Sequence, residues 1–342
     1  MMNYSQTLTH LLEHHDLPFA DMRDLMAQIM GGQLTPAQIA AVLIALRAKG
    51  ESVTEIAAAA TVMRELSTKV QVKNNAHLID TCGTGGDGAQ TFNISTASAI
   101  VAAAAGARVA KHGGRSVSST CGSADVLEKL GVNVNLTPEQ VAQCVDEIGV
   151  GFMFAPNHHS AMKHAAPVRR ELGVRTLFNL LGPLTNPANA QNQVLGVFHP
   201  SLTTKLAQVL SELGSQHVLV VHGSDGLDEI TISGASNIAE LKGGKITEYT
   251  IQPADFGLQT ASLDAIRVTN VDEAKTMLLS VLDNQPSTAR DIVLLNAGAA
   301  IYVAGLTNSL ADGVNTASQV ISSGAAKAKL AQLISISQRA AA

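Results

Sequence analysis

Apolar residues recur at helical spacing through roughly the first 70 residues, and polar start and stop signals divide this stretch into short helices. Thr35-Pro36-Ala37-Gln38 is a capping box with proline at the first helical position, which predicts a helix running to Lys49-Gly50. Ser52-Val53-Thr54-Glu55 is a second capping box and predicts the start of the next helix. Gly31-Gly32 predicts the end of the helix before Thr35. The region therefore predicts a compact unit of about four helices joined by short turns.

From His77 onward, short apolar segments alternate with helical ones, and this alternation favours crossover units and a mainly parallel sheet. We expect helices between the strands, one starting at Thr137-Pro138 and another after Pro200-Ser201. Residues 230–250 predict antiparallel strands with turns at Ser233-Gly234 and Gly243-Gly244, and the chain from Val271 onward predicts mostly helix. The expected parallel strands are Leu78-Ile79, Ala107–Ala110, Val150–Phe154, Val194–Val197 and Val218–Val221.

These patterns predict an α/β protein with two domains. The smaller is all-helical and covers residues 1–72, completed by helices within about residues 160–190, and the larger covers residues 73–342 around a mainly parallel sheet. A length of 342 residues with 46% hydrophobic and 15% charged residues is large enough for such a core and excludes a mainly disordered chain.

Charge and composition narrow the function classes. The net charge of −5, the 3% of aromatic residues and the absence of Trp argue against bulk nucleic-acid binding. Three cysteines at no metal-ligand spacing suit a reducing compartment, and the first residues lack the features of a signal peptide, so we expect a cytoplasmic protein. The longest apolar run, Ile292–Leu306, is interrupted by Asn296 and is too short to span a bilayer, so it predicts a buried helix.

The strongest local signal is the glycine-rich stretch Asp80–Gly88, which follows a predicted strand. Its glycines allow tight turns in which successive N–H groups point at phosphate oxygens, although a plain tight turn remains an alternative. It lacks both the G-x-G-x-x-G dinucleotide pattern and the lysine of a nucleoside-triphosphate loop. Asn93-Ile94-Ser95-Thr96 then opens an alanine-rich helix, where phosphate binding at the helix N-terminus competes with simple N-capping by Ser95 or Thr96.

Two further segments carry charge. Lys111–Ser119 combines Lys111, Arg115, adjacent glycines and three serines after a strand, which predicts a second anion-binding loop, and we give His112 little weight as a proton donor. Asp228-Glu229 follows another strand and predicts magnesium held with the help of substrate phosphate, with a solvated acidic turn as the alternative.

Basic residues between positions 157 and 170 suggest an acceptor site. Of the adjacent helical residues Arg169 and Arg170, only one can face a pocket, where it would bind a substrate carboxylate. His158, His159 and His164 lack a zinc pattern and are interpreted as polar lining or helix surface.

Taken together, the motifs resemble those of the anthranilate phosphoribosyltransferase family over nearly the whole chain. The resemblance rests on five segments in order: Gly83-Thr84-Gly85-Gly86-Asp87, Asn93–Thr96, Lys111-His112-Gly113, Phe178–Pro187 and Asp228-Glu229. It implies a pentosyltransferase of tryptophan biosynthesis that uses 5-phosphoribosyl 1-diphosphate (PRPP), anthranilate and Mg²⁺, and that dimerises through its helical domain. The products would be N-(5-phosphoribosyl)anthranilate and diphosphate.

The resemblance also implies roles for individual residues. The Phe178–Pro187 run would brace the interdomain region, and no residue is assigned as a catalytic acid or base. Metal binding falls to Ser95, Asp228 and Glu229, and anthranilate binding to Gly83, Gly114 and Arg169. The residues expected to bind PRPP are Gly83, Gly86, Asp87, Thr91, Asn93, Ile94, Ser95, Thr96, Lys111, His112, Gly113, Arg115, Ser118, Ser119 and Ser123.

The sequence departs from the family pattern in the second loop. Gly114 stands where the family usually has Asn, and Thr120-Cys121 where it has Lys-Ser, so anthranilate affinity depends on this loop more than PRPP affinity does. Two alternatives are a pyrimidine nucleoside phosphorylase, which typically has a further C-terminal domain that we do not expect here, and a non-catalytic nucleic-acid-binding relative.

Overall fold

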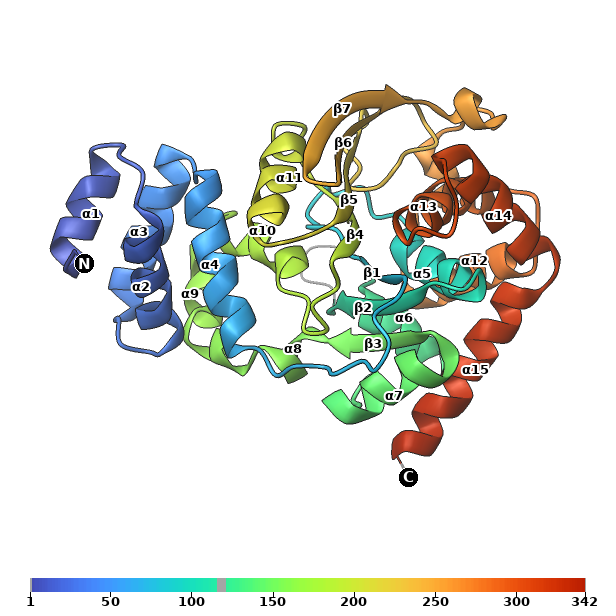
Figure 1. The fold of residues 1–342 in the computed structure, drawn as a ribbon, viewed down its shortest axis with the longest axis horizontal. Helices are drawn as coiled ribbons and strands as arrows, with labels where there is room; N and C mark the ends of the chain where they lie inside the picture. The colour runs from blue at the N-terminus through green and yellow to red at the C-terminus, as the bar shows by residue number, and fades with distance from the viewer. Residues whose placement is uncertain (1, 116–120, 342) are drawn as a thin grey trace.

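The N-terminal part of the chain is a bundle of four helices (Figure 1). The computed structural model describes residues 2–115 and 121–341. The predicted capping boxes are confirmed, because the side chains of Thr35 and Ser52 accept hydrogen bonds from the backbone N–H groups of Gln38 and Glu55. Gly31 follows the second helix, as the sequence indicates. The helices are α1 (Tyr4–Leu12), α2 (Phe19–Met30), α3 (Pro36–Lys49) and α4 (Val53–Leu66).

The rest of the chain is built on a seven-stranded sheet of order β3-β2-β1-β4-β5-β6-β7. Strands β1 to β5 are parallel, and β6 and β7 run antiparallel to their neighbours with the predicted turn at Gly243-Gly244 between them. The expected α/β class is therefore confirmed. The strands are β1 (Leu78–Thr81), β2 (Arg108–Gly113), β3 (Val150–Phe154), β4 (Asn192–Gly196), β5 (His217–Gly223), β6 (Ser236–Lys242) and β7 (Lys245–Ile251).

Helices cover both faces of the sheet (Figure 1). Alternate residues of β5 face opposite sides of the sheet. Leu219 and Val221 join the core beneath α5 and α12–α15, whereas Val218 and Val220 join the core that contains α11 and the N-terminal bundle. The helices are α5 (Ile94–Ala104), α6 (Ser123–Leu130), α7 (Pro138–Ile148), α8 (Ala155–His158), α9 (Ala166–Leu172), α10 (Phe178–Leu181), α11 (Leu202–Glu212), α12 (Val271–Leu282), α13 (Thr288–Val303), α14 (Leu310–Ser322) and α15 (Ala325–Ala341), with 3₁₀ turns at Ser160–His164, Gly182–Leu184, Pro253–Phe256 and Leu263–Ile266.

Three local expectations need correction. Strand β2 continues past Ala110 to Gly113, so Lys111 and His112 are strand residues and not loop residues, because their backbones pair with β3 at Phe152 and Met153. Ser233-Gly234 is a bend leading into β6, not a turn between two paired strands. The strand predicted at Val194–Val197 is β4, which begins two residues earlier at Asn192 and ends at Gly196.

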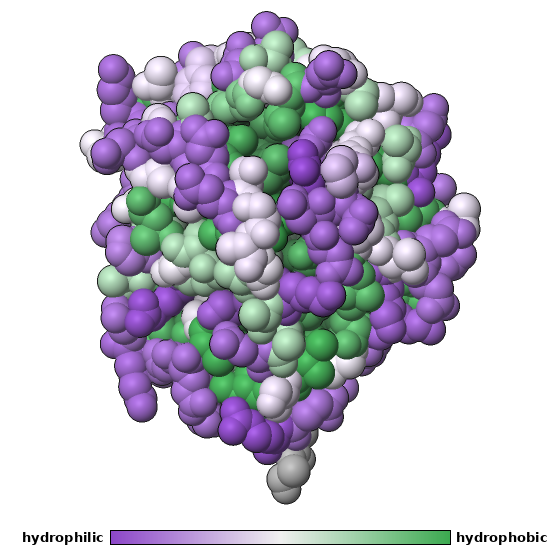
Figure 2. Space-filling model, turned by 90° about the vertical axis from the view of Figure 1, so that its right-hand side faces the viewer, coloured by the Kyte–Doolittle hydropathy of each residue, from purple (hydrophilic) through white to green (hydrophobic). Residues whose placement is uncertain are grey.

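The apolar run that contains Asn296 forms the buried helix α13, as expected. None of the helices in the described part of the chain is both long and apolar enough to cross a membrane. Figure 2 shows the side of the molecule opposite the N-terminal bundle, where apolar patches are separated by hydrophilic side chains.

The sheet topology determines where a ligand can bind. Strands β2 and β3 lie on one side of β1, and the chain then crosses back to place β4 and β5 on the other side. The strand order therefore reverses between β1 and β4. In open parallel sheets, ligands bind at the carboxyl ends of the strands at such a reversal. The glycine-rich stretch follows β1, and the acidic pair follows β5 at the same rim.

Candidate functional site

The glycine-rich stretch forms a loop that is held against the end of β4. The N–H of Thr84 donates to the carbonyl of Gly196 (2.9 Å), and the Thr84 hydroxyl accepts from the N–H of Phe198 (3.2 Å). Gly85 and Gly86 have φ angles of 65° and 79°, a region that L side chains rarely adopt. The loop therefore has a defined shape in which glycine is needed.

The start of α5 is left without a side-chain cap. Asn93 is the N-cap residue, but its side chain makes no capping hydrogen bond; Nδ2 donates instead to the carbonyl of Cys121 (3.1 Å). Asn93 Oδ1 and Thr96 Oγ1 are buried and have no hydrogen-bond partner within the described ranges. This helix start has unused polar groups, which favours anion binding over the N-capping alternative.

The side chain of Lys111 extends from β2 to the start of α5. Its side chain is buried, and Nζ donates to the carbonyl of Thr81 and to Oγ of Ser95 (3.2 Å). A positive charge thus lies between the end of β1 and the start of α5.

A buried carboxyl lies beneath this lysine. Asp80 is fully buried and accepts hydrogen bonds from the N–H of His112 (3.1 Å) and from Nδ2 of Asn186 (2.6 Å). Burial raises the pKa of Asp80 to about 6, against the opposing effects of Lys111 and these hydrogen bonds. Asn186, from the Phe178–Pro187 run, also donates to the carbonyl of Ala110 (2.9 Å), so this run is tied to β1 and β2.

The acidic pair meets the glycine-rich loop directly. The N–H of Gly85 donates to Oδ2 of Asp228 (2.7 Å), and a Cβ atom on Gly83 would lie 2.5 Å from the same oxygen. The backbone and the hydroxyl of Ser95, at the start of α5, face Glu229 and lower the pKa of its carboxyl, against the larger effect of burial. The pair is half-buried and engaged on both sides, so it is not a solvated acidic turn.

Three carboxyl groups share this corner. Burial raises the pKa of Asp228 well above its usual value, and the charges of Asp87 and Glu229 raise it further. Burial likewise raises the pKa of Glu229 to about 7, with Asp87 adding to the shift and Lys111 opposing it. A cation placed here would relieve this mutual repulsion.

These residues fit magnesium bound together with a phosphate-bearing ligand. The donors are carboxylate and hydroxyl oxygens, which Mg²⁺ prefers. Within residues 2–115 and 121–341, no group of three or more His, Cys, Asp or Glu side chains is arranged to hold a metal ion by itself. Mg²⁺ usually binds through one or two carboxylates, with substrate phosphate and water completing the shell, so Asp228 and Glu229 suffice.

Arg115, Gly113 and Gly114, from the described part of the second loop, contact other residues of the chain. Arg115 is exposed and forms ion pairs with Asp125 (3.0 Å) and Glu128 (2.6 Å) of α6, so its charge is already engaged away from the glycine-rich loop. Gly113 packs against Phe152 and Ser123, where a Cβ atom would lie 3.0 Å from the phenylalanine ring. The carbonyl of Gly114 accepts a hydrogen bond from the N–H of Ala124 (3.1 Å). Ser118 and Ser119 lie outside the described residues.

The remaining expected PRPP residues border the start of α5. Thr91 forms an isolated antiparallel bridge with Arg267, and Ile94 is buried in the core beneath α5. Neither side chain presents a charge.

Helix α9, which carries Arg169 and Arg170, lies against helix α3 of the N-terminal bundle. Arg169 is half-buried, with its guanidinium 5.3 Å from the centre of the Phe178 ring, while Arg170 is exposed. Burial lowers the pKa of Arg169. One arginine of the pair therefore points inward, as helical geometry requires for adjacent residues.

A group of histidines also lies here, and of the two expected interpretations, polar lining and helix surface, the burial of His158 and His159 excludes helix surface for these two residues. His158 and His159 are buried, and the His112 and His159 rings are 5.0 Å apart. Nε2 of His112, of His158 and of His159 has no partner among the residues described. Burial lowers the pKa of His112 to about 3, so this imidazole is neutral at pH 7.

Sequence reasoning missed one basic residue next to the glycine-rich loop. Arg175 donates a hydrogen bond to the carbonyl of Gly86, and its guanidinium lies 4.1 Å from the centre of the Phe198 ring. It follows Gly173 and Val174 in a short loop, and no local motif marks it.

Comparison with known proteins places the chain in a family. Models of the glycosyl transferase family match residues 75–327 (a/b domain) and residues 5–67 (helical bundle domain). The chain is 61% identical over 342 residues to anthranilate phosphoribosyltransferase of Laribacter hongkongensis and 60% identical over 341 residues to that of Nitrosomonas europaea, with 100% of each chain covered. The chain belongs to the anthranilate phosphoribosyltransferase family.

Solved structures of the family agree with this assignment. The structure of anthranilate phosphoribosyltransferase from Thermus thermophilus is 42% identical with a TM-score of 0.92, and the alignment covers 97% of this chain and 99% of that one. The Saccharomyces cerevisiae enzyme in complex with PRPP and Mg is 26% identical with a TM-score of 0.89, covering 98% of both chains. The resemblance expected from the motifs is confirmed, and neither alternative, nucleoside phosphorylase or non-catalytic nucleic-acid-binding relative, is supported. Membership makes the chain a glycosyltransferase of tryptophan biosynthesis.

Proposed function

We propose that this chain transfers the 5-phosphoribosyl group of PRPP to the amine of anthranilate and releases diphosphate. The observation that carries the proposal is the convergence of four segments at one rim of the sheet: the glycine-rich loop, the acidic pair, the end of β2 and the start of α5. Asp228 meets the glycine-rich loop at Gly85 (2.7 Å), and Lys111 meets the start of α5 at Ser95 (3.2 Å). PRPP has phosphates at two ends of a ribose, and such a ligand needs several anion-binding groups in one place.

The chain's own groups stabilise the leaving diphosphate. The bond between the anomeric carbon and the diphosphate oxygen breaks with its electron pair passing to oxygen, so negative charge grows on the diphosphate. Lys111, the glycine-rich loop and the N-terminus of α5 lie together at this rim and supply the positive charge and the helix dipole that stabilise the diphosphate. Mg²⁺ bound by Asp228, Glu229 and Ser95 would neutralise part of the diphosphate charge.

The acceptor needs orientation more than activation. The amine of anthranilate is neutral at pH 7 and forms the new bond to the anomeric carbon with its own electron pair, after which its proton is lost to solvent. We infer that the half-buried Arg169 guanidinium binds the anthranilate carboxylate, and that Gly83 and Gly114 also line the anthranilate site. No strong general base is required.

A coupled assay tests the proposed function. Purified protein is mixed with PRPP, anthranilate and MgCl₂, and the loss of anthranilate fluorescence is followed together with diphosphate release. We expect equal amounts of both, and no turnover when EDTA replaces Mg²⁺. Release of free base from thymidine or uridine with phosphate, in the absence of anthranilate turnover, would refute the proposal.

Two adjacent arginines provide a matched test of the acceptor site. Arg169→Ala removes the inward-facing guanidinium, and Arg170→Ala removes an exposed one from the same helix turn. Loss of a charge-assisted hydrogen bond corresponds to about 1.5–3 kcal/mol, so Arg169→Ala should raise the KM for anthranilate about 10- to 100-fold. The KM for anthranilate of Arg170→Ala should stay near the wild-type value. Equal effects of both substitutions would refute the role of Arg169.

We also propose the division into a helical domain of residues 1–72, completed by helices within about residues 160–190, and an α/β domain of residues 73–342. In support, Ala165, Val168 and Phe178 pack in the same apolar cluster as α2, α3 and α4. The proposed acceptor residue Arg169 then lies on the helical domain while the PRPP residues lie on the α/β domain.

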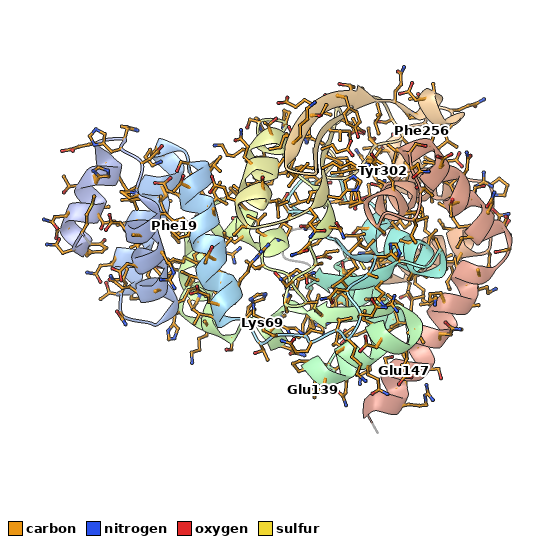
Figure 3. All side chains as sticks on the ribbon, in the orientation of Figure 1. Phe19, Lys69, Glu139, Glu147, Phe256 and Tyr302 are labelled. Carbon is orange, nitrogen blue, oxygen red and sulfur yellow. The ribbon has the colours of Figure 1, made fainter. Side chains whose placement is uncertain are left out.

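We further propose that two copies associate through the helical domain. Exposed large apolar side chains lie on its helices, at Leu12, Phe19, Ile44 and Leu66, and Figure 3 shows Phe19 on α2. Sedimentation of the double variant Leu12→Glu/Ile44→Glu should reveal a monomer, whereas Gln319→Glu on the exposed face of α14 should remain a dimer. A wild-type monomer at micromolar concentration would refute the dimer.

The three cysteines, Cys82, Cys121 and Cys144, are free thiols, which supports the proposal that the protein resides in the reducing cytoplasm. Fractionation of cells that produce the protein, with activity recovered in the cytosolic fraction, is the corresponding test.

A further inference from the structure

Asn296 is a polar residue in the middle of an apolar helix. It lies on α13, where it is 2% exposed among buried residues such as Leu295 and Ala297. Burying an amide is unfavourable unless its polar atoms form hydrogen bonds. The residue is therefore expected to have a specific partner.

The main partner is the backbone of Ile230, which lies in the loop of residues 224–235 between β5 and β6, called here the acidic loop because it contains Asp228 and Glu229. Oδ1 of Asn296 accepts from the N–H of Ile230 (2.9 Å), and Nδ2 donates to the carbonyl of Ile230 (2.8 Å). Nδ2 also donates to the carbonyl of Ile292 one turn earlier in α13 (2.9 Å), which fixes the orientation of the planar amide. Two hydrogen bonds to one residue define its orientation as well as its position.

Ile230 directly follows Glu229, so its position limits where the Glu229 side chain can lie. A small cavity of about 10 Å³ is lined by Ser95, Glu229 and Asn296 among others, which places Asn296 near Glu229 and the start of α5. The Asn296 amide thus holds the backbone of the residue next to Glu229.

The other end of the acidic loop is anchored within the loop itself. Asp225 accepts hydrogen bonds from the N–H of Leu227 (3.1 Å) and from the hydroxyls of Thr231 (2.5 Å) and Ser233. These contacts fix the shape of the loop, whereas Asn296 fixes the loop to the core helix.

We propose that Asn296 is a positioning residue for the metal-diphosphate end of the site, holding Glu229 at the start of α5. The inference rests on the proposed function, because it assigns Glu229 to Mg²⁺ in the presence of PRPP. Without the amide, Ile230 loses both backbone partners, and Glu229 samples positions unsuited to the ion. The Mg²⁺ concentration needed for PRPP binding (the Mg²⁺ requirement) should rise, while the acceptor site is unaffected.

The experiment measures PRPP binding without turnover. The thermal unfolding midpoint is recorded at fixed PRPP over a range of Mg²⁺ concentrations, and the half-saturating Mg²⁺ concentration is obtained from the PRPP-induced increase. Asn296→Leu keeps a side chain that branches at the same carbon and removes both hydrogen bonds to Ile230. We expect the half-saturating Mg²⁺ concentration to rise about tenfold, the effect of losing one or two net hydrogen bonds.

A second substitution and a control separate positioning from general destabilisation. Asn296→Ser gives a hydroxyl that bonds to the carbonyl one turn earlier, so its own polarity is satisfied while Ile230 still loses its partners. It should shift the Mg²⁺ requirement in the same direction. Val303→Ala truncates a buried side chain two turns further along α13 and should lower the unfolding midpoint without ligand, with the Mg²⁺ requirement unchanged.

The outcomes distinguish this inference from the proposed function. An unchanged Mg²⁺ requirement in either folded Asn296 variant, beside a wild-type response to PRPP and Mg²⁺, would overturn the positioning role alone. An equal shift in Val303→Ala would do the same. A wild-type protein that PRPP does not stabilise at any Mg²⁺ concentration would overturn the proposed function and this inference with it.

Discussion

The guanidinium of Arg175 donates a hydrogen bond to the carbonyl of Gly86 and lies over the ring of Phe198, 4.1 Å from its centre. It thereby connects the loop between α9 and α10 to the glycine-rich loop and to the segment after β4. Its backbone partner Gly86 has a φ of 79°, so the carbonyl orientation depends on a conformation that glycine adopts readily.

We expect Arg175→Ala to raise the KM for PRPP about tenfold, with a smaller change in the KM for anthranilate. The reason is that a hydrogen bond from a charged donor contributes about 1.5 kcal/mol or more to holding the loop. Arg175→Lys keeps the charge but loses the planar stacking on Phe198, so its KM for PRPP should lie between those of the wild type and of Arg175→Ala. Steady-state kinetics with each substrate varied provide the measurement, and a change confined to anthranilate would contradict this role.

Gly196 at the end of β4 should tolerate no side chain. A Cβ atom there would lie 1.5 Å from the backbone oxygen of Asp228, so Gly196→Ala must displace the acidic loop. Such overpacking costs about 1–3 kcal/mol, and we expect both a lower unfolding midpoint and a kcat/KM for PRPP reduced about 100-fold. Gly182→Ala is the stability control, because its Cβ atom would meet nothing within 4 Å and its φ is −49°. A fully active Gly196→Ala enzyme would show that the acidic loop is displaced without consequence.

Gly114→Asn should lower the KM for anthranilate. The resemblance implies Asn at this position, and among the described residues no atom lies within 4 Å of a Cβ atom placed on Gly114. The new amide would offer hydrogen bonds to the acceptor, an effect of about 1 kcal/mol or roughly fivefold. Gly114→Ala, which adds bulk without an amide, is the matched control. An unchanged or raised KM in Gly114→Asn would contradict this interpretation of the loop.

Acid stability should depend on Glu240 of β6. Its carboxylate accepts hydrogen bonds from Tyr302 (2.8 Å) and Tyr249 (2.9 Å) and pairs with His217 (2.9 Å). Burial alone would raise the pKa of Glu240, but these partners outweigh it and lower the pKa to about 2. Figure 3 shows Tyr302 on α13.

Because the folded pKa of Glu240 lies below its unfolded value, its stabilisation is present above about pH 4.5 and is lost as the pH falls toward 2. Glu240→Gln should therefore lower the free energy of unfolding by about 1.5–3 kcal/mol at pH 6, and this difference should shrink at pH 3. Urea denaturation at both pH values measures it. A difference that stays constant between pH 6 and pH 3 would show that the Glu240 charge is not the cause.

Much of this fold could be predicted from local sequence. The capping boxes at Thr35 and Ser52 and the apolar strand segments depend on residues a few positions apart, and they place helices and parallel strands where the structure has them. Because parallel strands share one rim for their carboxyl ends, the order of glycine-rich, basic and acidic segments already predicts a common phosphate site.

Strand ends and burial were harder to predict. Lys111 and His112 are polar enough for a loop, yet pairing with β3 extends β2 through them. His158 and His159 are buried, and His158 bonds through Nδ1 to the carbonyl of Thr68 in the segment before β1, a contact that helical periodicity does not reveal.

The amino-acid order by itself determined the local conformations and the kinds of chemistry that each segment can offer, since these follow from side-chain type and near-neighbour spacing. Only the tertiary structure decided the pairs: Gly85 with Asp228, Asp80 with Asn186, and Asn296 with Ile230. The physical reason is that such contacts depend on strand order and on which helix face meets which loop, and residues separated by 143, 106 and 66 positions carry no periodic signal of their proximity.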